Sequence, residues 1–244
     1  MKKLSVIIPI YNEKNTIKIL LDFVLNVDLS ELDFEKEIII VEGNSTDGTR
    51  NIIKTYEQKP NIKIIYEDKP KRKGAAVRQG FKHVTGEIIL IQDGDLEYKP
   101  DEYPLLIKPF IDNNAMVVYG SRHMNNNKNG QIRDFSDDRI YAFLLNAGSI
   151  LYTALFNLLY KTKLTDPATM FKVFRTKLIK DMKFKTSGFD FDIELTAKLI
   201  KSGHKIIEIP ISYKSRSVKD GKKIKFFRDG FRVFLAIVRF SFSD

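Results

Sequence analysis

Short apolar runs alternate with segments of helical spacing through the first half of the chain. The strand-like runs are residues 4–10, 37–41, 62–66 and 87–91, and the segments with helical spacing are 14–27, 46–56 and 73–84. This alternation is typical of βαβ units and predicts a mostly parallel sheet flanked by helices. Ligands of such sheets bind beyond the carboxyl ends of the strands. The loops that follow these runs are therefore the candidates for function.

The second half of the chain has a different pattern. Residues 123–138 are polar and rich in asparagine, whereas residues 140–160 contain no charged side chain. A strand-like run at 170–174, a helical segment at 191–201 and an apolar strand at 206–213 follow. We find no internal repeat and no clear domain boundary. We therefore expect an α/β catalytic domain over residues 1–213 and a basic, aromatic, amphipathic segment over residues 214–244.

The composition allows a globular core and favours anionic partners. Hydrophobic residues make up 43% of the 244 residues, and 41 Lys and Arg against 31 Asp and Glu give a formal net charge of +10. Such a charge attracts nucleotides, nucleic acid or anionic lipid headgroups. The chain shows no recognisable nucleic-acid module, so we expect no nucleic-acid partner. It has no cysteine, which excludes a disulfide framework and a thiolate metal site.

The first apolar run resembles a signal peptide only briefly. It is short, contains Pro9 and is followed early by Glu13, with no small-residue cleavage site. We interpret it as the first strand and expect no signal peptide.

An acidic cluster follows the strand-like run at 87–91. Asp93, Asp95 and Glu97 occupy alternate positions, which point the same way on an extended segment. Hard oxygen ligands at this spacing suit Mg²⁺ or Mn²⁺, which complete their coordination with water and phosphate. The cation would then hold a diphosphate. The alternative is a solvated acidic turn before Pro100.

Two further loops have candidate chemistry. In "VEGNSTDGT", Glu42 stands at a strand end and can accept hydrogen bonds from a base or a ribose, whereas Ser45 or Asp47 can cap the next helix. In "KPKRKGAAVRQG", Lys73 and the helix N-terminus can attract a diphosphate. The alternative for the rest of this segment is a solvated basic loop.

Several stretches together resemble family 2 inverting glycosyltransferases with the GT-A (Rossmann-like) fold. They are "VIIPIYNE", "VEGNSTDGT", "KGAAVRQGF", "LIQDGDLEYKPDEYP", "VVYGSR", "KLTDPATMFKVFR", "SGFDFDIELTAKLIKSGHKIIEIPISY" and "RSVKDGKKI". The closest resemblance is to polyprenyl-phosphate glycosyltransferases of the dolichyl-phosphate mannose synthase type, and it covers nearly the whole chain in order. One departure concerns the second loop, which usually reads D-D-G-S in the family. Here Gly43 replaces a carboxylate, which affects the expected choice of donor.

The resemblance implies a reaction and its substrates. A hexose on a nucleoside diphosphate, GDP-mannose or UDP-glucose, is attacked at its anomeric carbon by a dolichyl or undecaprenyl phosphate, and the configuration inverts. The alternative is a saccharide or other hydroxyl acceptor in cell-surface glycan synthesis. A third possibility is a nucleotide-binding or membrane-scaffold protein without catalysis, against which the complete acidic cluster argues.

The resemblance also implies roles for particular residues. Asp95 and Glu97 would bind Mg²⁺ or Mn²⁺, with Asp93 near the metal and the ribose. The expected donor-binding residues are Pro9, Tyr11, Glu13, Glu42, Lys73, Asp93, Lys222 and Lys223. The arginines expected at donor or acceptor phosphates are Arg122, Arg139 and Arg216, with Arg133 competing for the role of Arg139.

The need for a base depends on the acceptor. A lipid phosphate is already ionised, so arginines that orient two anions matter more than a base. A hydroxyl acceptor requires a base, for which Asp190, Asp192 and Glu194 are the candidates. Their alternative role is that of ordinary acids at a helix start.

The C-terminal segment suggests contact with a membrane. On an ideal helix, Lys225, Arg228, Arg232 and Arg239 share one narrow arc, and aromatic and aliphatic side chains cover the rest. This pattern predicts a helix in an anionic membrane interface. Residues 140–160 are long enough to span a membrane, but polar residues interrupt them, so we expect a second interfacial or core-packed helix. We therefore expect a peripheral or monotopic protein at the cytoplasmic face. The alternative is that both helices pack on the sheet.

Overall fold

The computed structural model describes residues 1–124, 139–216 and 226–242, and in the last range no side chain before Asp229. Its centre is a seven-stranded sheet in the order β3-β2-β1-β4-β6-β5-β7. The strands are β1 (Lys2–Ile10), β2 (Phe34–Glu42), β3 (Ile62–Tyr66), β4 (Ile88–Ile91), β5 (Val117–Ser121), β6 (Lys172–Arg175) and β7 (Ile206–Pro210). Only β6 runs antiparallel to its neighbours, β4 and β5. The expected α/β, mostly parallel sheet is confirmed.

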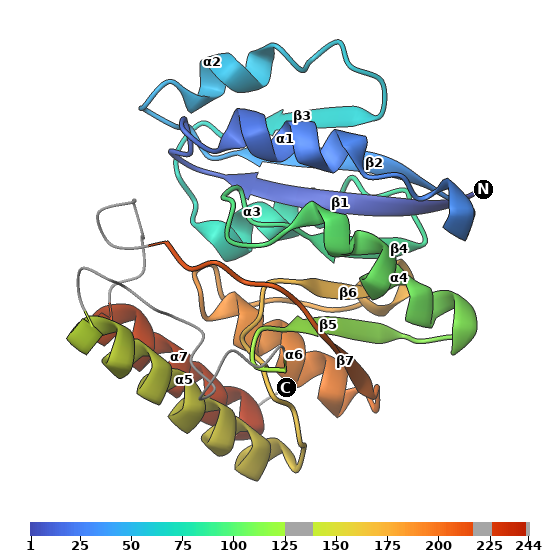
Figure 1. Cartoon of the computed structure of the whole chain (residues 1–244). Coiled ribbons are helices and arrows are strands. Elements are labelled where there is room, and N and C mark those ends of the chain that lie inside the picture. The colour runs from blue at the N-terminus through green and yellow to red at the C-terminus, as the bar shows by residue number, and fades with distance from the viewer. Residues whose placement is uncertain (125–138, 217–225, 243–244) are drawn as a thin grey trace.

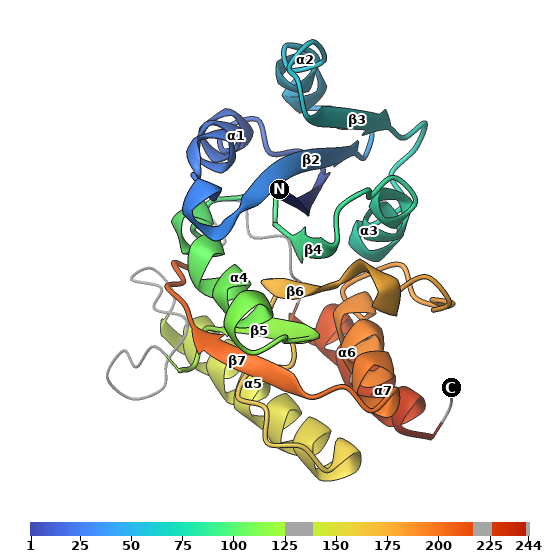
Figure 2. The same ribbon diagram turned by 90° about the vertical axis from the view of Figure 1, so that its right-hand side faces the viewer.

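Helices cover both faces of this sheet. They are α1 (Ile17–Asn26), α2 (Thr49–Lys54), α3 (Lys73–Phe81), α4 (Tyr103–Asp112), α5 (Arg139–Tyr160), α6 (Phe191–Lys201) and α7 (Phe226–Phe242). Short 3₁₀ turns occupy Ser30–Leu32, Pro100–Glu102 and Thr176–Leu178. Figures 1 and 2 show α1 and α4 on one face, α3 and α6 on the other, and α5 beside α7 near the β7 end. The helices expected at residues 140–160 and in the C-terminal segment are therefore present as α5 and α7.

The core explains the continuous apolar runs of the sequence. The central strands are buried on both faces, so β4 has no exposed residue. Helix α3 lies close to the sheet because Gly80 has no side chain: a Cβ there would stand 2.6 Å from Cγ2 of Ile7. Its first turn is equally close to α6, where a Cβ on Gly74 would stand 2.5 Å from Cβ of Phe191. The small residues of "KGAAVRQG" thus allow the basic start of α3 to pack closely against both the sheet and α6.

A second apolar cluster joins α7 to the rest of the molecule. Phe156 of α5, Ile193 and Ala197 of α6, and Ile237 and Phe240 of α7 are all buried together. The C-terminal helix therefore packs on α5 and α6.

Most predicted elements occur near their predicted positions. The strand at 62–66 and the helix at 191–201 are confirmed at both ends. The helix predicted from residue 46 begins at Thr49, because the Asp47 carboxylate accepts the Thr49 N–H at 2.9 Å and Gly48 has φ +99°. The strand predicted to residue 213 ends at Pro210, which has no N–H for a ladder.

Candidate functional site

The loops at the carboxyl ends of β1 and β4 meet at a cavity of about 430 Å³. Pro9 of β1 lines it with Tyr11 and Glu13 of the loop that follows. Asp93, Asp95 and Glu97 of the loop after β4 line it as well. The first residue of α3, Lys73, and two arginines, Arg122 and Arg216, also line it. The structure therefore brings most of the predicted site residues to one place.

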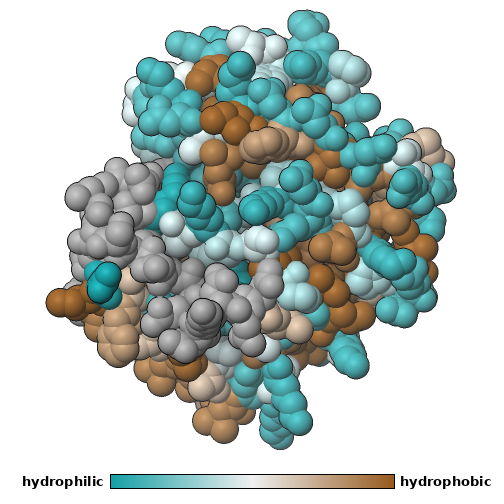
Figure 3. All heavy atoms as spheres, in the orientation of Figure 1, coloured by the Kyte–Doolittle hydropathy of each residue, from teal (hydrophilic) through white to brown (hydrophobic). Residues whose placement is uncertain are grey.

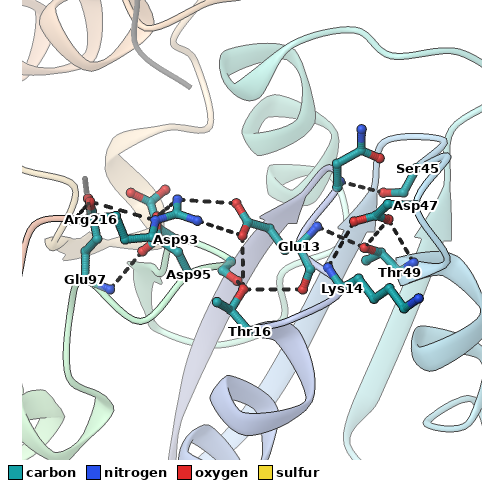
Figure 4. Close-up of polar contacts among 12 residues, drawn as sticks. Glu13, Lys14, Thr16, Ser45, Asp47, Thr49, Asp93, Asp95, Glu97 and Arg216 are labelled. Atoms are coloured by element: carbon teal, nitrogen blue, oxygen red, sulfur yellow. Dashed lines mark hydrogen bonds and ion pairs between the residues drawn. The ribbon is translucent and has the colours of Figure 1, made fainter. Parts of the chain in front are cut away.

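The acidic loop surrounds the side chain of Arg216. Arg216 Nη2 lies 2.5 Å from Asp95 Oδ2, and Nη1 lies 3.0 Å from Glu13 Oε2. The Arg216 backbone N–H donates to Glu97 Oε1 at 2.7 Å. Figure 4 shows Glu13, Asp95 and Glu97 arranged around this guanidinium. A cation from the C-terminal part of the chain thus offsets the repulsion among the carboxylates.

The third acid of the cluster has a different partner. Asp93 Oδ1 lies 2.5 Å from Lys73 Nζ, and this ammonium lies 5.7 Å from the centroid of the Phe189 ring. The helix start that was predicted to attract a diphosphate therefore stands directly beside the acidic cluster.

The electrostatics of Asp95 reflect its crowded position. Burial, together with the nearby carboxylates of Asp93 and Glu97, raises the pKa of Asp95 to about 7, although Arg216 acts in the opposite direction. A second cation near Asp95 would favour its ionised form.

The cluster has the chemistry of a divalent metal site, but Arg216 lies within it. Among the described residues, no group of three or more His, Cys, Asp and Glu is arranged to hold a metal ion. The carboxylates of Asp95, Glu97 and Glu13 nevertheless converge on one positive charge, and hard oxygen ligands suit Mg²⁺ or Mn²⁺. The oxygen ligands of these side chains thus suit such a cation in chemical type, and in this structure they contact the guanidinium of Arg216.

Arg122 is a rigid cation in the cavity wall. Its Nε and Nη2 donate to the two oxygens of Asp166 at 2.7 and 2.8 Å. Asp166 is buried, and its N–H donates to Glu208 Oε1 of β7 at 2.8 Å. The guanidinium also faces the Tyr213 ring at 5.2 Å. These contacts fix the direction of Arg122, which suits an arginine that positions a phosphate.

The three acids at the start of α6 have different surroundings. The Glu194 carboxylate accepts hydrogen bonds from two backbone N–H groups of the preceding loop, at 2.8 Å each. It therefore holds that loop against the start of α6. Asp190 Oδ1 accepts the Gly188 N–H at 3.0 Å. Of the three, Asp192 lines the cavity.

Asp192 combines burial with an unsatisfied oxygen. Its Oδ1 has no hydrogen-bond partner in the described structure. Burial raises the pKa of Asp192 to about 6, while the charges of Lys73 and Lys172 act against this rise. A buried carboxylate of this kind suits the general base that a hydroxyl acceptor requires.

Glu42 stands at the end of β2, as predicted, but it does not line the cavity. Its carboxylate is buried below the loop, where Oε2 lies 2.5 Å from Arg50 Nε and Oε1 accepts the Ser45 N–H at 2.7 Å. Both oxygens are thereby used within the protein, and Gly43 lines the cavity instead. A nearby carboxylate, Glu67, also lines it and has an Oε1 without a hydrogen-bond partner.

The substitution Glu42→Gln should therefore affect stability more than donor binding. Breaking the pair with the partly exposed Arg50 should cost on the order of 2–3 kcal/mol, or about 4–12 °C in Tm. The KM for the donor should stay within about twofold, because neither carboxylate oxygen faces the cavity. Thermal melting and donor kinetics check this, with Glu35→Gln, an exposed position of the same strand, as control. A normal Tm with a raised donor KM would contradict this and show that Glu42 binds the donor.

Other predicted residues lie elsewhere. Arg139 is the first residue of α5, is exposed and does not line the cavity. Arg133, Lys222 and Lys223 lie outside the described residues. Arg232 of α7 was predicted to face headgroups, but it lines the cavity.

The cavity lies at the carboxyl edge of an α/β sheet, and comparisons with known proteins identify the family of the chain. The profile described as Glycosyl transferase family 2 matches residues 5–183. The chain therefore belongs to this family of glycosyltransferases.

Two curated relatives act on lipid phosphates according to their names. A dolichol-phosphate mannosyltransferase of Pyrococcus furiosus is 29% identical over 222 residues, which cover 90% of this chain and 59% of the relative. A dolichyl-phosphate beta-glucosyltransferase of Trichomonas vaginalis is 28% identical over 234 residues, covering 91% of this chain and 68% of the relative. These names agree with the predicted polyprenyl-phosphate type, although the chain spans only about three fifths of the first relative.

Solved structures confirm the GT-A fold. A glucosyl-3-phosphoglycerate synthase of Mycobacterium tuberculosis, crystallised with Mn²⁺, UDP and phosphoglyceric acid, has a TM-score of 0.72 and 16% identity. The match covers 98% of this chain and 78% of that protein. Another crystal of the synthase contains Mg²⁺ and UDP. At this identity the likeness shows the fold alone.

Proposed function

We propose that the protein transfers a hexose from GDP-mannose or UDP-glucose to a polyprenyl phosphate, with inversion and with Mg²⁺ or Mn²⁺. The observation that carries this proposal is the single cavity in which Asp93, Asp95 and Glu97 lie beside Lys73 and Arg216. Such a site suits a diphosphate leaving group, because both cations and metal-binding carboxylates are present. The named activities of the two curated relatives support the lipid-phosphate acceptor.

The described side chains suggest how the reaction proceeds. A phosphate oxygen of the acceptor attacks the anomeric carbon, and the bond from this carbon to the diphosphate oxygen breaks. Its electron pair leaves with the nucleoside diphosphate. Lys73 and Arg216 stabilise the charge that develops there, while Arg122 orients the acceptor phosphate. A divalent cation held by Asp95 with Asp93 or Glu97 would neutralise the leaving group further. No proton must be removed, because the acceptor is already an anion.

A hydroxyl acceptor is the second candidate, and Asp192 is the observation that favours it. Its unpartnered Oδ1 and raised pKa suit a base that removes a proton from an attacking hydroxyl. In the lipid-phosphate reaction Asp192 would instead balance the charges of Lys73 and Lys172.

The helix pair α5 and α7 supports attachment to an anionic membrane surface. Among the described residues, α5 is the one helix long and apolar enough to cross a membrane, with a mean hydropathy of 1.6. Large exposed side chains of this pair are Ile140, Phe143, Leu144, Ile150, Leu151, Leu158, Phe231, Phe234, Leu235 and Phe242. Figure 3 shows hydrophobic residues gathered along the lower part of the molecule, over these helices. We infer that the pair lies in the interface at the cytoplasmic face, which the net positive charge of the chain favours.

An acceptor panel tests the proposed function. The protein, Mn²⁺ and each labelled donor are mixed in detergent with polyprenyl phosphate, the matching polyprenol, or 3-phosphoglycerate. We expect transfer to polyprenyl phosphate at a rate at least about 100-fold above the polyprenol, since the alcohol has no anionic nucleophile. Equal or faster transfer to a hydroxyl acceptor would favour the second candidate, and Asp192→Asn should then abolish it. Donor binding without transfer to any acceptor would contradict both.

A further inference from the structure

Helix α7 faces two environments. Asp229 and Arg232 line the catalytic cavity, whereas Phe231, Phe234 and Leu235 of the same helix are exposed. The other side of the helix is buried against α5 and α6. A polar edge of the cavity and an apolar exposed surface therefore lie within two turns of one helix.

The side chain of Arg232 is held less tightly than the other cavity arginines. Within the described residues it makes one ion pair, with Asp229 Oδ1 at 4.0 Å, and the side chain is 40% exposed. Arg122, by contrast, makes a bidentate pair with Asp166 at 2.7 and 2.8 Å, and Arg216 contacts three carboxylates. The N–H groups of Arg232 are therefore the more available for an incoming anion.

The position of Arg232 is set by a close approach of α5 and α7. A Cβ on Gly230 would stand 2.8 Å from the Tyr152 hydroxyl of α5, so glycine allows the two helices to pack closely there. Figures 1 and 2 show α5 and α7 lying side by side. Asp229, which is buried, stands three residues before Arg232 and provides a nearby carboxylate that orients its guanidinium.

From this placement we infer that Arg232 binds the phosphate of the lipid acceptor where the cavity meets the apolar surface of α5 and α7. This inference rests on the proposed function. A prenyl chain requires an apolar surface, and its phosphate must reach the cavity that contains Lys73, Arg122 and Arg216. Arg232 is the described cation that belongs to both regions. Its planar guanidinium can donate two parallel hydrogen bonds to a phosphate, which an ammonium does less well.

The test separates acceptor binding from donor binding. We assay Arg232→Gln and Arg232→Lys in detergent with farnesyl phosphate or a longer polyprenyl phosphate. The control for the loss of one charge is Lys201→Gln, at an exposed position outside the cavity. We expect Arg232→Gln to raise the acceptor KM at least about 10-fold, with the donor KM within about twofold. The acceptor KM of Arg232→Lys should lie between those of Arg232→Gln and the wild type. Binding of farnesyl phosphate should weaken to the same extent, whereas binding of farnesol should stay unchanged.

The possible outcomes either support or overturn the inference. An unchanged acceptor KM, or an equal effect of Lys201→Gln, would overturn it. A loss of both farnesyl phosphate and farnesol binding would show that Arg232 only supports the helix packing. If Arg232→Gln does not fold, the acceptor KM of Arg232→Lys is compared with that of the wild type. A raised value supports the inference and an unchanged value overturns it. A wild-type protein that transfers nothing to lipid phosphate would instead contradict the proposed function itself.

Discussion

Asp95→Asn should abolish metal-dependent binding of the donor and reduce transfer by about 10³-fold or more, while the protein stays folded. Asparagine keeps the shape of the side chain but removes the charge that a divalent cation requires. The metal-free variant should melt at or above the wild-type temperature at pH 8. Burial and neighbouring carboxylates raise the pKa of Asp95 to about 7, so the protein loses stability as the pH rises from about 4 to about 7, and the whole cost is present at pH 8.

The control for this substitution is Asp101→Asn. Asp101 is exposed in the 3₁₀ turn that follows the acidic loop and does not line the cavity. Titration of Mn²⁺ with and without nucleoside diphosphate measures binding, and thermal melting measures stability. Full transfer activity in Asp95→Asn would show that the acidic cluster is not the metal site.

Arg216→Ala should have two opposite effects. Transfer should fall by about 10²–10³-fold, because a cation that stabilises the leaving diphosphate is lost. Binding of Mn²⁺ to the protein without nucleotide should become tighter, because in the wild type the guanidinium lies among the carboxylates of Glu13, Asp95 and Glu97. In the wild type the metal must displace this cation, and in the variant it need not.

Melting temperatures check the same account without an activity measurement. Without metal, Arg216→Ala should melt several degrees below the wild type, since the carboxylates repel one another once the guanidinium is removed. Mn²⁺ should raise the Tm of the variant more than that of the wild type. A low Tm that Mn²⁺ does not restore, with normal specific activity, would assign Arg216 to structure alone.

The sequence predicts the acidic cluster because its geometry is local. Three acids within residues 93–97, just after a strand end, stay close together even though the segment bends, with the Glu97 N–H donating to Asp95 Oδ1 at 3.0 Å. The sheet edge that holds them follows from alternating apolar and helical segments. Lys73 beside Asp93 follows likewise, because the start of α3 and the end of β4 lie at the same edge.

Contacts made by distant segments could not be predicted in this way. The partner of Asp95 is Arg216, 121 residues along the chain, and only the tertiary structure brings them together. The sequence places Glu42 at the correct strand end, but it does not show that Arg50 of the following helix pairs with the buried Glu42 carboxylate. The side chain of Glu42 is buried at the end of β2, and the backbone of the next residue, Gly43, lines the cavity instead.

The sequence also could not predict which face of α7 turns toward the rest of the protein. An ideal helix gives the relative directions of its side chains but not the direction in which the whole helix turns. Packing of Ile237 and Phe240 against α5 and α6 fixes that direction and turns Arg232 toward the cavity. The buried carboxylate of Glu67 gave no signal, because one acid in a charged loop is usually solvated.

The coupling between nucleotide release and lipid glycosylation tests the central claim most directly. Nucleoside diphosphate and lipid-linked sugar are counted in the same reaction, with polyprenyl phosphate present or absent and with a chelator as a further arm. The account predicts one nucleoside diphosphate for each lipid-linked sugar, with neither product formed when the lipid phosphate or the divalent cation is missing. Nucleotide release at the same rate without lipid phosphate, or sugar that stays in the aqueous phase, would contradict it.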